Sequence, residues 1–292
     1  MISVIIATYN RANMIDRAVE SVLNQSYDDF EIVIVDDGST DNTEEVIRQI
    51  HNNNIKYFQL SENKGQAFAR NYGVEMAQGN FITFLDSDDY YYDKDVLSKI
   101  VLHTKDYDVI SFSKYCIEKN GERFFEESKI TGDAFEYLMQ HPLHYIGKPP
   151  YAVNRKLFLD SNGFDTNLSW GEAIPFWRRL FATGAKLGIV NDIGYVVVVH
   201  SNSRVSTGGN RDRKTAKKSM HDAYLKAFRE NPNYFENHKV IKSIWLILLF
   251  KTSKSMRNFY LMKNYFAEII KNGLPEFFKA YLLLKSGEIS EG

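Results

Sequence analysis

The stretch Phe81-Ile82-Thr83-Phe84-Leu85-Asp86-Ser87-Asp88-Asp89 joins an apolar run to three carboxylates within four positions. Such a run predicts a buried strand that ends where the acidic residues begin. Because residues i and i+2 of an extended segment point to the same side, Asp86 and Asp88 can converge on one ligand. Carboxylates this close repel one another unless a cation or a donor-rich group compensates their charge. The stretch therefore fits either a site for a divalent ion and phosphate oxygens, or an acidic turn in which Asp89 caps a helix.

Strand and helix patterns alternate along the N-terminal part of the chain. The expected strands cover residues 3–7, 31–35, 55–58 and 81–85, and the expected helices cover residues 14–24, the segment up to residue 50 and residues 67–77. Uninterrupted apolar strands that alternate with helices predict an α/β fold whose sheet is largely parallel and covered on both faces. Ligands bind such sheets at the carboxyl ends of the strands. Three polar clusters follow strands here: Thr8-Tyr9-Asn10, Asp36-Asp37-Gly38-Ser39 and Asp86-Ser87-Asp88-Asp89.

Composition narrows the class of protein. The chain has 292 residues with 44% hydrophobic and 25% charged residues, which is typical of a globular protein. A net charge of -1 gives no support to nucleic acid as a partner. The single cysteine, Cys116, fits a reducing compartment. We read no signal peptide at the start of the sequence, and the apolar run 244–250 is far shorter than the ~20 residues of a membrane span. We therefore expect a cytoplasmic location.

The rest of the chain is less regular and then becomes helical. Residues 107–200 contain two strand patterns and one helix pattern, and from about residue 212 the pattern is helical and basic. Between residues 239 and 285, nine Lys or Arg residues outnumber two Glu residues and are interleaved with aromatic side chains. Such a segment is either a helical subdomain that packs on the protein or a second subunit, or a surface that lies on an anionic membrane.

Four motifs in order carry a family resemblance. They are residues 4–11 (VIIATYNR), 31–41 (EIVIVDDGSTD), 63–71 (NKGQAFARN) and 79–89 (GNFITFLDSDD). Together they resemble the inverting family 2 glycosyltransferases of the GT-A fold, of the bacterial polysaccharide type. The resemblance covers roughly the first 110 residues and resumes more weakly at residues 162–165, 170–172 and 200–203. It implies a GT-A catalytic domain over residues 1–211, with a nucleotide-binding half (1–110) and an acceptor-side half (111–211), followed by a helical region over 212–292.

The resemblance also implies substrates and site residues. The donor would be a nucleotide sugar, most often linked to uridine diphosphate (UDP), and the acceptor a glycan or a lipid-linked sugar. Mn²⁺ or Mg²⁺ would bridge the diphosphate, bound by Asp88 with help from Asp86 and His200. The implied nucleotide contacts are Asp37 and Tyr9 at the uracil, Ala7 and Thr8 lining its pocket, Arg70 and Lys64 over the nucleotide or sugar, Asp86 at the ribose, and Arg204 at phosphate oxygens. Asp36 should be structural, since adjacent strand residues point to opposite faces.

The expected catalytic base is missing. Inverting transferases use a carboxylate to deprotonate the acceptor hydroxyl, and the family presents it as the Asp of a Glu-Asp pair. Here the pair is Glu172-Ala173. Three explanations compete: an inactivated variant with Ala173 in place of Asp, Glu172 acting as the base, or a natural non-catalytic relative. A sugar-nucleotide-binding or scaffold protein is therefore the alternative function. A nucleotidyltransferase is disfavoured, because the loop after the first strand lacks the glycines of a phosphate-binding loop.

Overall fold

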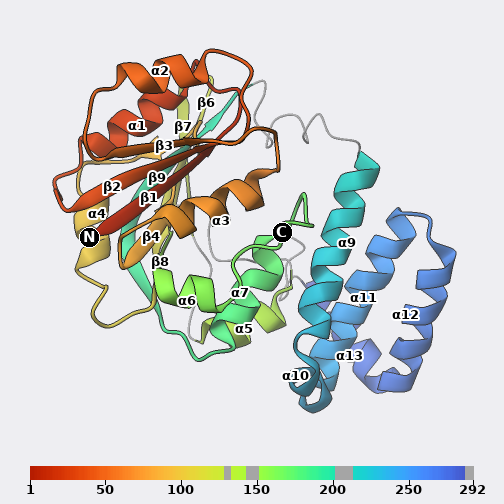
Figure 1. Ribbon diagram of the computed structural model, residues 1–292. Helices are drawn as coiled ribbons and strands as arrows, with labels where there is room; N and C mark the ends of the chain where they lie inside the picture. Colours follow the sequence, from red (N-terminus) through yellow and green to blue (C-terminus); the bar gives the residue numbers. More distant parts are fainter. Residues whose placement is uncertain (128–132, 143–150, 201–212, 287–292) are drawn as a thin grey trace. The chain divides into compact units, whose positions relative to one another are not determined.

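The computed structural model describes residues 1–127, 133–142, 151–200 and 213–286 (Figure 1). The described chain forms two compact units. The first contains residues 1–127, 151–166 and 185–200, and the second contains residues 133–142, 167–184 and 213–286. The predicted boundary between residues 211 and 212 stays a prediction.

The N-terminal part of the first unit is the predicted alternation of strands and helices. The sheet order is β3-β2-β1-β4, and all neighbouring strands in this part are parallel. β1 and β2 are buried along nearly their whole length, which explains why both are continuous apolar runs. The strands are β1 (Ile2–Thr8), β2 (Phe30–Asp36), β3 (Ile55–Gln59) and β4 (Phe81–Phe84), and the helices are α1 (Ile15–Leu23), α2 (Thr43–Gln49) and α3 (Gln66–Met76).

Helix α3 packs unusually close to the sheet because of Gly73. A Cβ atom at this position would lie 2.5 Å from Ile5 Cγ2 and 3.3 Å from Val35 Cγ2. Both contacts come from strands, so a larger residue would push the helix away from β1 and β2. Since α3 carries Gln66 and Arg70, this close contact fixes how far those side chains reach over the strand ends.

The second half of the sheet is mixed, a feature that the sequence pattern did not predict. β8 (Tyr151–Asn154) is antiparallel to both β4 and β6 (Val109–Lys119), while β6 is parallel to β9 (Leu187–Val199). β5 (Tyr90–Tyr91) pairs with β9, and β7 (Glu122–Glu127) pairs with β6. Two short helices, α4 (Val96–Val101) and α6 (Arg155–Asp160), complete this unit.

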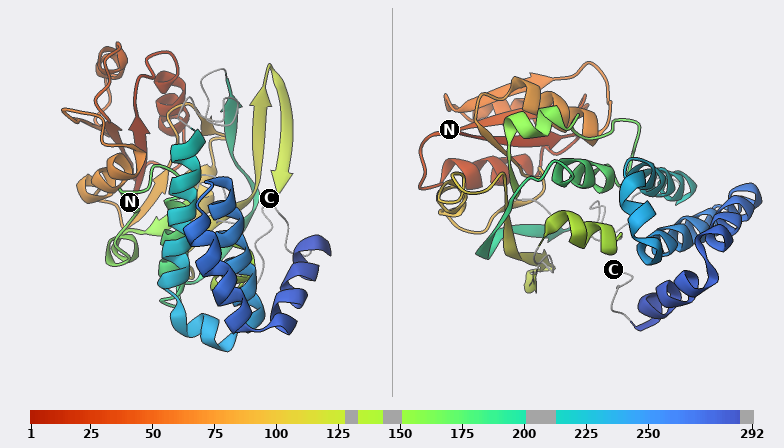
Figure 2. Two further views of the ribbon diagram at one scale, coloured as in Figure 1. Left: turned by 90° about the vertical axis from the view of Figure 1, so that its right-hand side faces the viewer. Right: turned by 90° about the horizontal axis from the view of Figure 1, so that it is seen from below.

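The second unit is helical and has its own core. Trp245 is fully buried there, and its Nε1–H donates to the Met139 carbonyl at 2.7 Å. α12 and α13 both contact α11, and Figure 2 draws these blue helices from two further sides. The helices are α5 (Ala134–Gln140), α7 (Ala173–Phe181), α9 (Arg213–Arg229), α10 (Pro232–Asn237), α11 (Lys239–Ser255), α12 (Phe259–Asn272) and α13 (Leu274–Ser286).

The structure confirms the predicted α/β class with a helical C-terminal part. In the described ranges, no helix combines the length and the apolar character that crossing a membrane requires.

Candidate functional site

Polar loops follow β1, β2 and β4, which are adjacent parallel strands whose carboxyl ends share one edge of the sheet. Asn10 joins the first two loops. Its backbone N–H donates to Ser39 Oγ at 2.8 Å, and its side-chain oxygen accepts from the Thr40 N–H at 2.8 Å. Asn10 has a φ of 53°, a left-handed conformation that Asn tolerates better than most residues. The loops are therefore held together at the edge that the sequence pattern indicated.

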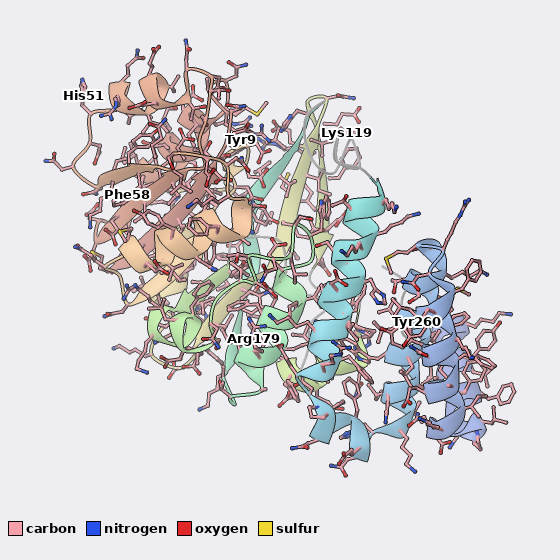
Figure 3. The ribbon with its side chains drawn as sticks, turned by 45° about the vertical axis from the view of Figure 1, so that its right-hand side comes forward. Tyr9, His51, Phe58, Lys119, Arg179 and Tyr260 are labelled. Carbon is pink, nitrogen blue, oxygen red and sulfur yellow. The ribbon has the colours of Figure 1, made fainter. Side chains whose placement is uncertain are left out.

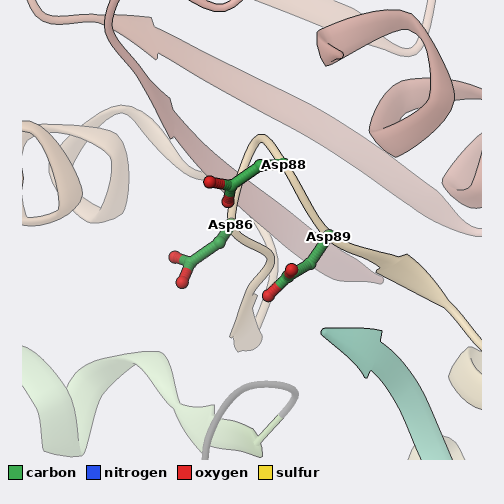
Figure 4. A group of neighbouring side chains, drawn as sticks. All are labelled: Asp86, Asp88 and Asp89. Atoms are coloured by element: carbon green, nitrogen blue, oxygen red, sulfur yellow. The ribbon is translucent and has the colours of Figure 1, made fainter. Parts of the chain in front are cut away.

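Three carboxylates gather in the loop after β4 (Figure 4). Asp86, Asp88 and Asp89 each offer one oxygen, and these oxygens lie within 4.8 Å of one another. The Asp89 N–H donates to the Asp86 carbonyl at 3.0 Å, so a tight turn brings the side chains together. Carboxylate oxygens are the ligands that Mg²⁺ and Mn²⁺ prefer, and the donor chemistry of this group therefore fits a hard divalent ion.

Asp86 lies beside a buried arginine from α3. Arg70 Nη2 is 2.5 Å from Asp86 Oδ1, and Gln66 Nε2 donates to the same oxygen at 3.2 Å. Arg70 is only 8% exposed, and its guanidinium lies over the rings of Phe84 and Phe164 at 5.9 Å from each centroid. A guanidinium held in this way is a fixed positive charge next to the carboxylate group.

Asp88 contacts two basic side chains from distant segments. His200 Nε2 lies 3.1 Å from Asp88 Oδ2, and Arg11 Nη2 lies 3.6 Å from the same oxygen. Because an ionised carboxylate only accepts hydrogen bonds, the imidazole nitrogen is the donor. His200 follows β9 directly, and Arg11 belongs to the loop after β1. The predicted His200–Asp88 neighbourhood is therefore present in the structure, while Arg11 was not predicted.

Asp89 and Arg17 hold the loop in place. Asp89 is buried, and its Oδ1 accepts from the Val198 N–H on β9 at 2.9 Å. Arg17 Nη2 donates to the Asp88 carbonyl at 3.2 Å, and its guanidinium lies 4.6 Å from the centroid of the Tyr90 ring. No local pattern in the sequence indicated Arg17, because its approach depends on how α1 packs against the sheet.

Asp37 binds the loop that precedes α3. Its two carboxylate oxygens accept from the backbone N–H groups of Lys64 and Gly65 at 2.7 and 2.8 Å. Gly65 has a φ of 94°, which favours glycine. The Lys64 ammonium lies 5.0 Å from the centroid of the Phe68 ring. A ligand contact at Asp37 stays a prediction.

Ala7 and the first polar cluster differ in burial from one residue to the next. Ala7 is partly exposed, Thr8 is 3% exposed and Tyr9 is 42% exposed. Thr8 Oγ1 is buried and has no hydrogen-bond partner among the described residues. A buried hydroxyl without a partner is costly, and a ligand at this edge of the sheet would offer one.

Asp36 has the structural role that alternation predicted. It is fully buried; its Oδ1 accepts from the Ser39 N–H at 2.7 Å, and its Oδ2 accepts from the Tyr57 hydroxyl at 2.8 Å. Burial, with the Asp36 hydrogen bond and charge, raises the pKa of Tyr57, so the phenol stays protonated as the donor.

Glu172 and Ala173 belong to the second unit, whereas the carboxylate group belongs to the first. Ala173 is the first residue of α7 and is partly exposed, and Glu172 precedes it at the N-cap position. Gly171 has a φ of 77°, and a Cβ there would lie 2.9 Å from Met220 Sδ and 3.2 Å from the Ala223 Cβ. The start of α7 therefore requires glycine at 171 both for its backbone conformation and for its contact with α9.

Arg178 anchors the same helix. It is fully buried; its Nη1 donates to the Ile174 carbonyl at 2.9 Å, and its Nη2 donates to the Leu138 carbonyl at 2.6 Å. Burial lowers the pKa of this guanidinium to about 9. These contacts hold the first turn of α7, where Glu172 and Ala173 lie. The predicted phosphate ligand Arg204 lies outside the described residues.

The chain matches the family described as "Glycosyl transferase family 2" over residues 3–162. It is 26% identical over 280 residues to the GalNAc(5)-diNAcBac-PP-undecaprenol beta-1,3-glucosyltransferase of Campylobacter jejuni, which covers 93% of this chain and 84% of that protein. It is 40% identical over 120 residues to the UDP-Glc:alpha-D-GlcNAc-diphosphoundecaprenol beta-1,3-glucosyltransferase of Escherichia coli, or 41% of this chain and 48% of that protein.

The similarity to solved structures shows the fold. A mannosyltransferase from Pyrobaculum calidifontis, solved with GDP-Man and Mn²⁺, has a TM-score of 0.62 and 19% identity, covering 98% of this chain and 79% of that one. Three Rickettsia glycosyltransferases are longer, and the matched part of this chain spans 29%, 38% and 34% of their lengths.

Proposed function

The chain belongs to glycosyltransferase family 2, and we propose that it transfers a sugar from a UDP-sugar donor to a hydroxyl group of a glycan or lipid-linked acceptor. The names of the Escherichia coli and Campylobacter jejuni relatives, one with a UDP-sugar donor and both with undecaprenol-linked acceptors, support this substrate class. In an inverting transfer, the acceptor oxygen forms a bond to the anomeric carbon while the bond from that carbon to the diphosphate breaks. The acceptor proton moves to a carboxylate base, and UDP leaves.

The carboxylate group after β4 is the observation that carries this proposal. Asp88 and Asp86 would hold a divalent ion, with His200 as a further ligand once its Nε2 has lost its proton. When bound, Mg²⁺ or Mn²⁺ neutralises negative charge on the diphosphate. The buried guanidinium of Arg70, fixed against Asp86, supplies positive charge from the protein itself.

The nucleoside would lie over the loops after β1 and β2. Thr8 Oγ1, a buried hydroxyl whose hydrogen bond no described residue satisfies, supports a polar ligand there. Tyr9 offers an exposed ring for stacking, and Asp37 offers acceptor oxygens for the uracil N–H. Lys64 is anchored through its backbone to Asp37, which would carry its ammonium group to the edge of the same site.

The residue at position 173 supports a second candidate function, the binding of a nucleotide sugar without transfer. Ala173 cannot take a proton, whereas Glu172 beside it can. If neither position supplies a base, the chain binds a nucleotide sugar without transferring it. The single cysteine is buried and has no second cysteine to pair with, which is typical of proteins in a reducing compartment. This supports a cytoplasmic location for either function.

Calorimetry with UDP tests the proposal. We expect UDP to bind more tightly in the presence of Mn²⁺ than in EDTA. In the Asp88→Asn variant, which keeps the shape of the side chain, the affinity for UDP should be the same with Mn²⁺ and with EDTA. Asp192→Asn is the matched control, because Asp192 is a half-exposed carboxylate in the same unit that pairs with Lys99 instead. Unchanged UDP affinity in Asp88→Asn with Mn²⁺ would contradict the metal assignment.

A further inference from the structure

Large exposed apolar side chains are concentrated on the last two described helices. Half of those in the described chain lie between residues 259 and 282: Phe259, Tyr260, Phe266, Ile270, Leu274, Phe278, Tyr281 and Leu282. Phe259 and Tyr260 are 76% and 74% exposed, and Figure 3 labels Tyr260 on the helical unit. Single exposed apolar residues are common on proteins, but a concentration of this kind indicates an interaction surface.

Helix α11 does not contribute to this surface. Its apolar residues Ile244, Trp245, Leu246, Ile247 and Leu249 are buried in the core of the second unit. The predicted membrane or oligomer segment, residues 239–285, therefore divides into a core helix and two helices with an exposed apolar face.

Each of these two helices carries lysine within its apolar stripe. On α12, Phe259, Lys263, Phe266 and Ile270 lie at helical spacing, and on α13, Leu274, Phe278, Tyr281 and Lys285 follow the same spacing; all are exposed. Another side of each helix packs inward, through Tyr265 and Ile269 on α12 and Ala280 on α13. We call the exposed stripes the α12–α13 face.

An exposed apolar face can bind a second copy of the chain or a membrane, and the charges on the α12–α13 face distinguish these two partners. Lys263, Lys271, Lys279 and Lys285 lie on these helices, against Glu268 and Glu276, and Glu268 already pairs with Lys271 at 2.8 Å. In a two-fold interface between copies, each face meets itself, so lysines would be buried near lysines without enough carboxylates to pair them. At an anionic membrane, the aromatic and leucine side chains enter the interface while the lysines extend to the lipid phosphates.

We infer that the α12–α13 face docks the protein on an anionic membrane surface. The inference extends the proposed lipid-linked acceptor, which would lie in that surface, and it is tested by binding alone. If sugar transfer or UDP binding fails, the membrane inference is therefore not contradicted. If membrane binding fails, the proposed UDP site is not contradicted.

The test uses the full chain and two kinds of vesicle. We expect flotation with phosphatidylcholine vesicles that contain phosphatidylglycerol, much less flotation with pure phosphatidylcholine, and loss of binding in high salt, which screens the lysines. The pair Phe266→Ser/Phe278→Ser should lower the partition coefficient at least tenfold. The pair Lys263→Gln/Lys279→Gln should lower it by about 25-fold, since each near-surface lysine contributes about a factor of five.

Two control pairs match these variants. Phe124→Ser/Phe125→Ser changes two phenylalanines of β7 that are 51% and 55% exposed, and Lys105→Gln/Lys156→Gln changes two exposed lysines of the first unit. Both pairs should bind vesicles like the parent chain, and circular dichroism checks that every variant is folded. Equal losses in the control pairs, or no flotation of the parent chain at low salt, would overturn the inference. A dimer that Phe266→Ser/Phe278→Ser dissociates, without vesicle binding, would assign the face to a second copy.

Discussion

Three neighbouring aspartates have three different sets of contacts. Asp89 is tied to the backbone of β9, Asp86 to the guanidinium of Arg70, and Asp88 to His200 and Arg11. A divalent ion would compete with the basic side chains for Asp86 and Asp88, whereas the Asp89 hydrogen bond can persist beside it. In the structure, these basic side chains compensate the negative charge of Asp86 and Asp88.

Asp37 should serve the fold as well as the ligand. In Asp37→Ala, the N–H groups of Lys64 and Gly65 lose their acceptors, which should cost about 1–3 kcal/mol of folding free energy. The affinity for uridine, UDP and a UDP-sugar should fall alike, by roughly ten- to a hundredfold, as expected for a charge-assisted hydrogen bond to the base. Chemical denaturation and calorimetry measure the two effects. If only the sugar-bearing donor weakens, Asp37 does not contact the base.

Restoring a carboxylate at residue 173 separates the three explanations of the missing base. Because this position opens α7, Ala173→Asp should keep or slightly raise stability, by about 0.3–1 kcal/mol, through the helix dipole. In an inactivated variant, the change should raise donor turnover by about 10²–10⁴-fold, followed as UDP release. If Ala173→Asp has no effect but Glu172→Gln abolishes turnover, Glu172 is the base. No turnover in either form supports the non-catalytic function.

The sequence indicated which polar residues lie at the strand ends better than it indicated their contacts. Carboxylates after a buried strand are a local signal, and so is the alternation that predicted a structural Asp36. Arg11 and Arg17 carried no such signal, because long side chains reach Asp88 only after α1 and the β1 loop have packed against the sheet. The Asp37 contacts to Lys64 and Gly65 depend in the same way on tertiary structure.

Among the elements, the first four strands were predicted within one or two residues. In the mixed half of the sheet, the two strand patterns, 109–112 and 195–199, covered only parts of β6 and β9, and the antiparallel pairing was not predicted. β8 is four residues long, too short for a periodicity to define it. The β6–β7 hairpin did have a signal: Asn120 and Gly121 both have positive φ values, 52° and 81°, and Asn-Gly favours this tight turn. The exposed and charged β7 lacks the alternation that would have supported it.

A buried histidine should make the helical unit sensitive to acid. His221 Nδ1 lies 2.7 Å from Thr252 Oγ1, and the Tyr265 hydroxyl lies 3.3 Å from its Nε2, so His221 links α9, α11 and α12. Burial lowers the pKa of His221, with a smaller lowering by Arg229 and an opposing effect of Asp222. The unfolded chain therefore binds more protons than the folded chain between the two pKa values, and stability rises with pH there.

The melting temperature of this unit should fall as the pH is lowered from about 7.5 through the unfolded His pKa of about 6.5 and on through the lower folded pKa. His221→Gln, which cannot be protonated, should flatten this dependence. The control variant is His238→Gln, at an exposed histidine whose Nδ1 lies 2.8 Å from the Tyr234 carbonyl. This variant should keep the pH dependence of the melting temperature. Thermal melting by tryptophan fluorescence measures both. An unchanged slope in His221→Gln would exclude His221 as its source.

For the whole molecule, the sheet and its carboxylate group belong to one unit, and helices α5, α7 and α9–α13 belong to the other. All three tryptophans, Trp170, Trp177 and Trp245, belong to the second unit, and the residues proposed to bind UDP belong to the first. Tryptophan fluorescence therefore reports the unfolding of one unit, and hydrogen exchange in β1, β2 and β4 reports the other.

UDP with Mn²⁺ should stabilise the two units unequally. A ligand at 100 times its dissociation constant adds about 2.7 kcal/mol to the free energy of unfolding of the structure that binds it. Because each unit has its own buried core, we expect this gain as slower exchange in β1, β2 and β4, with a smaller shift of the tryptophan transition. Asp88→Asn should remove both the slower exchange and the smaller shift of the tryptophan transition that UDP with Mn²⁺ produces. Equal shifts of both signals would instead show that the sheet and the helices unfold as one cooperative structure.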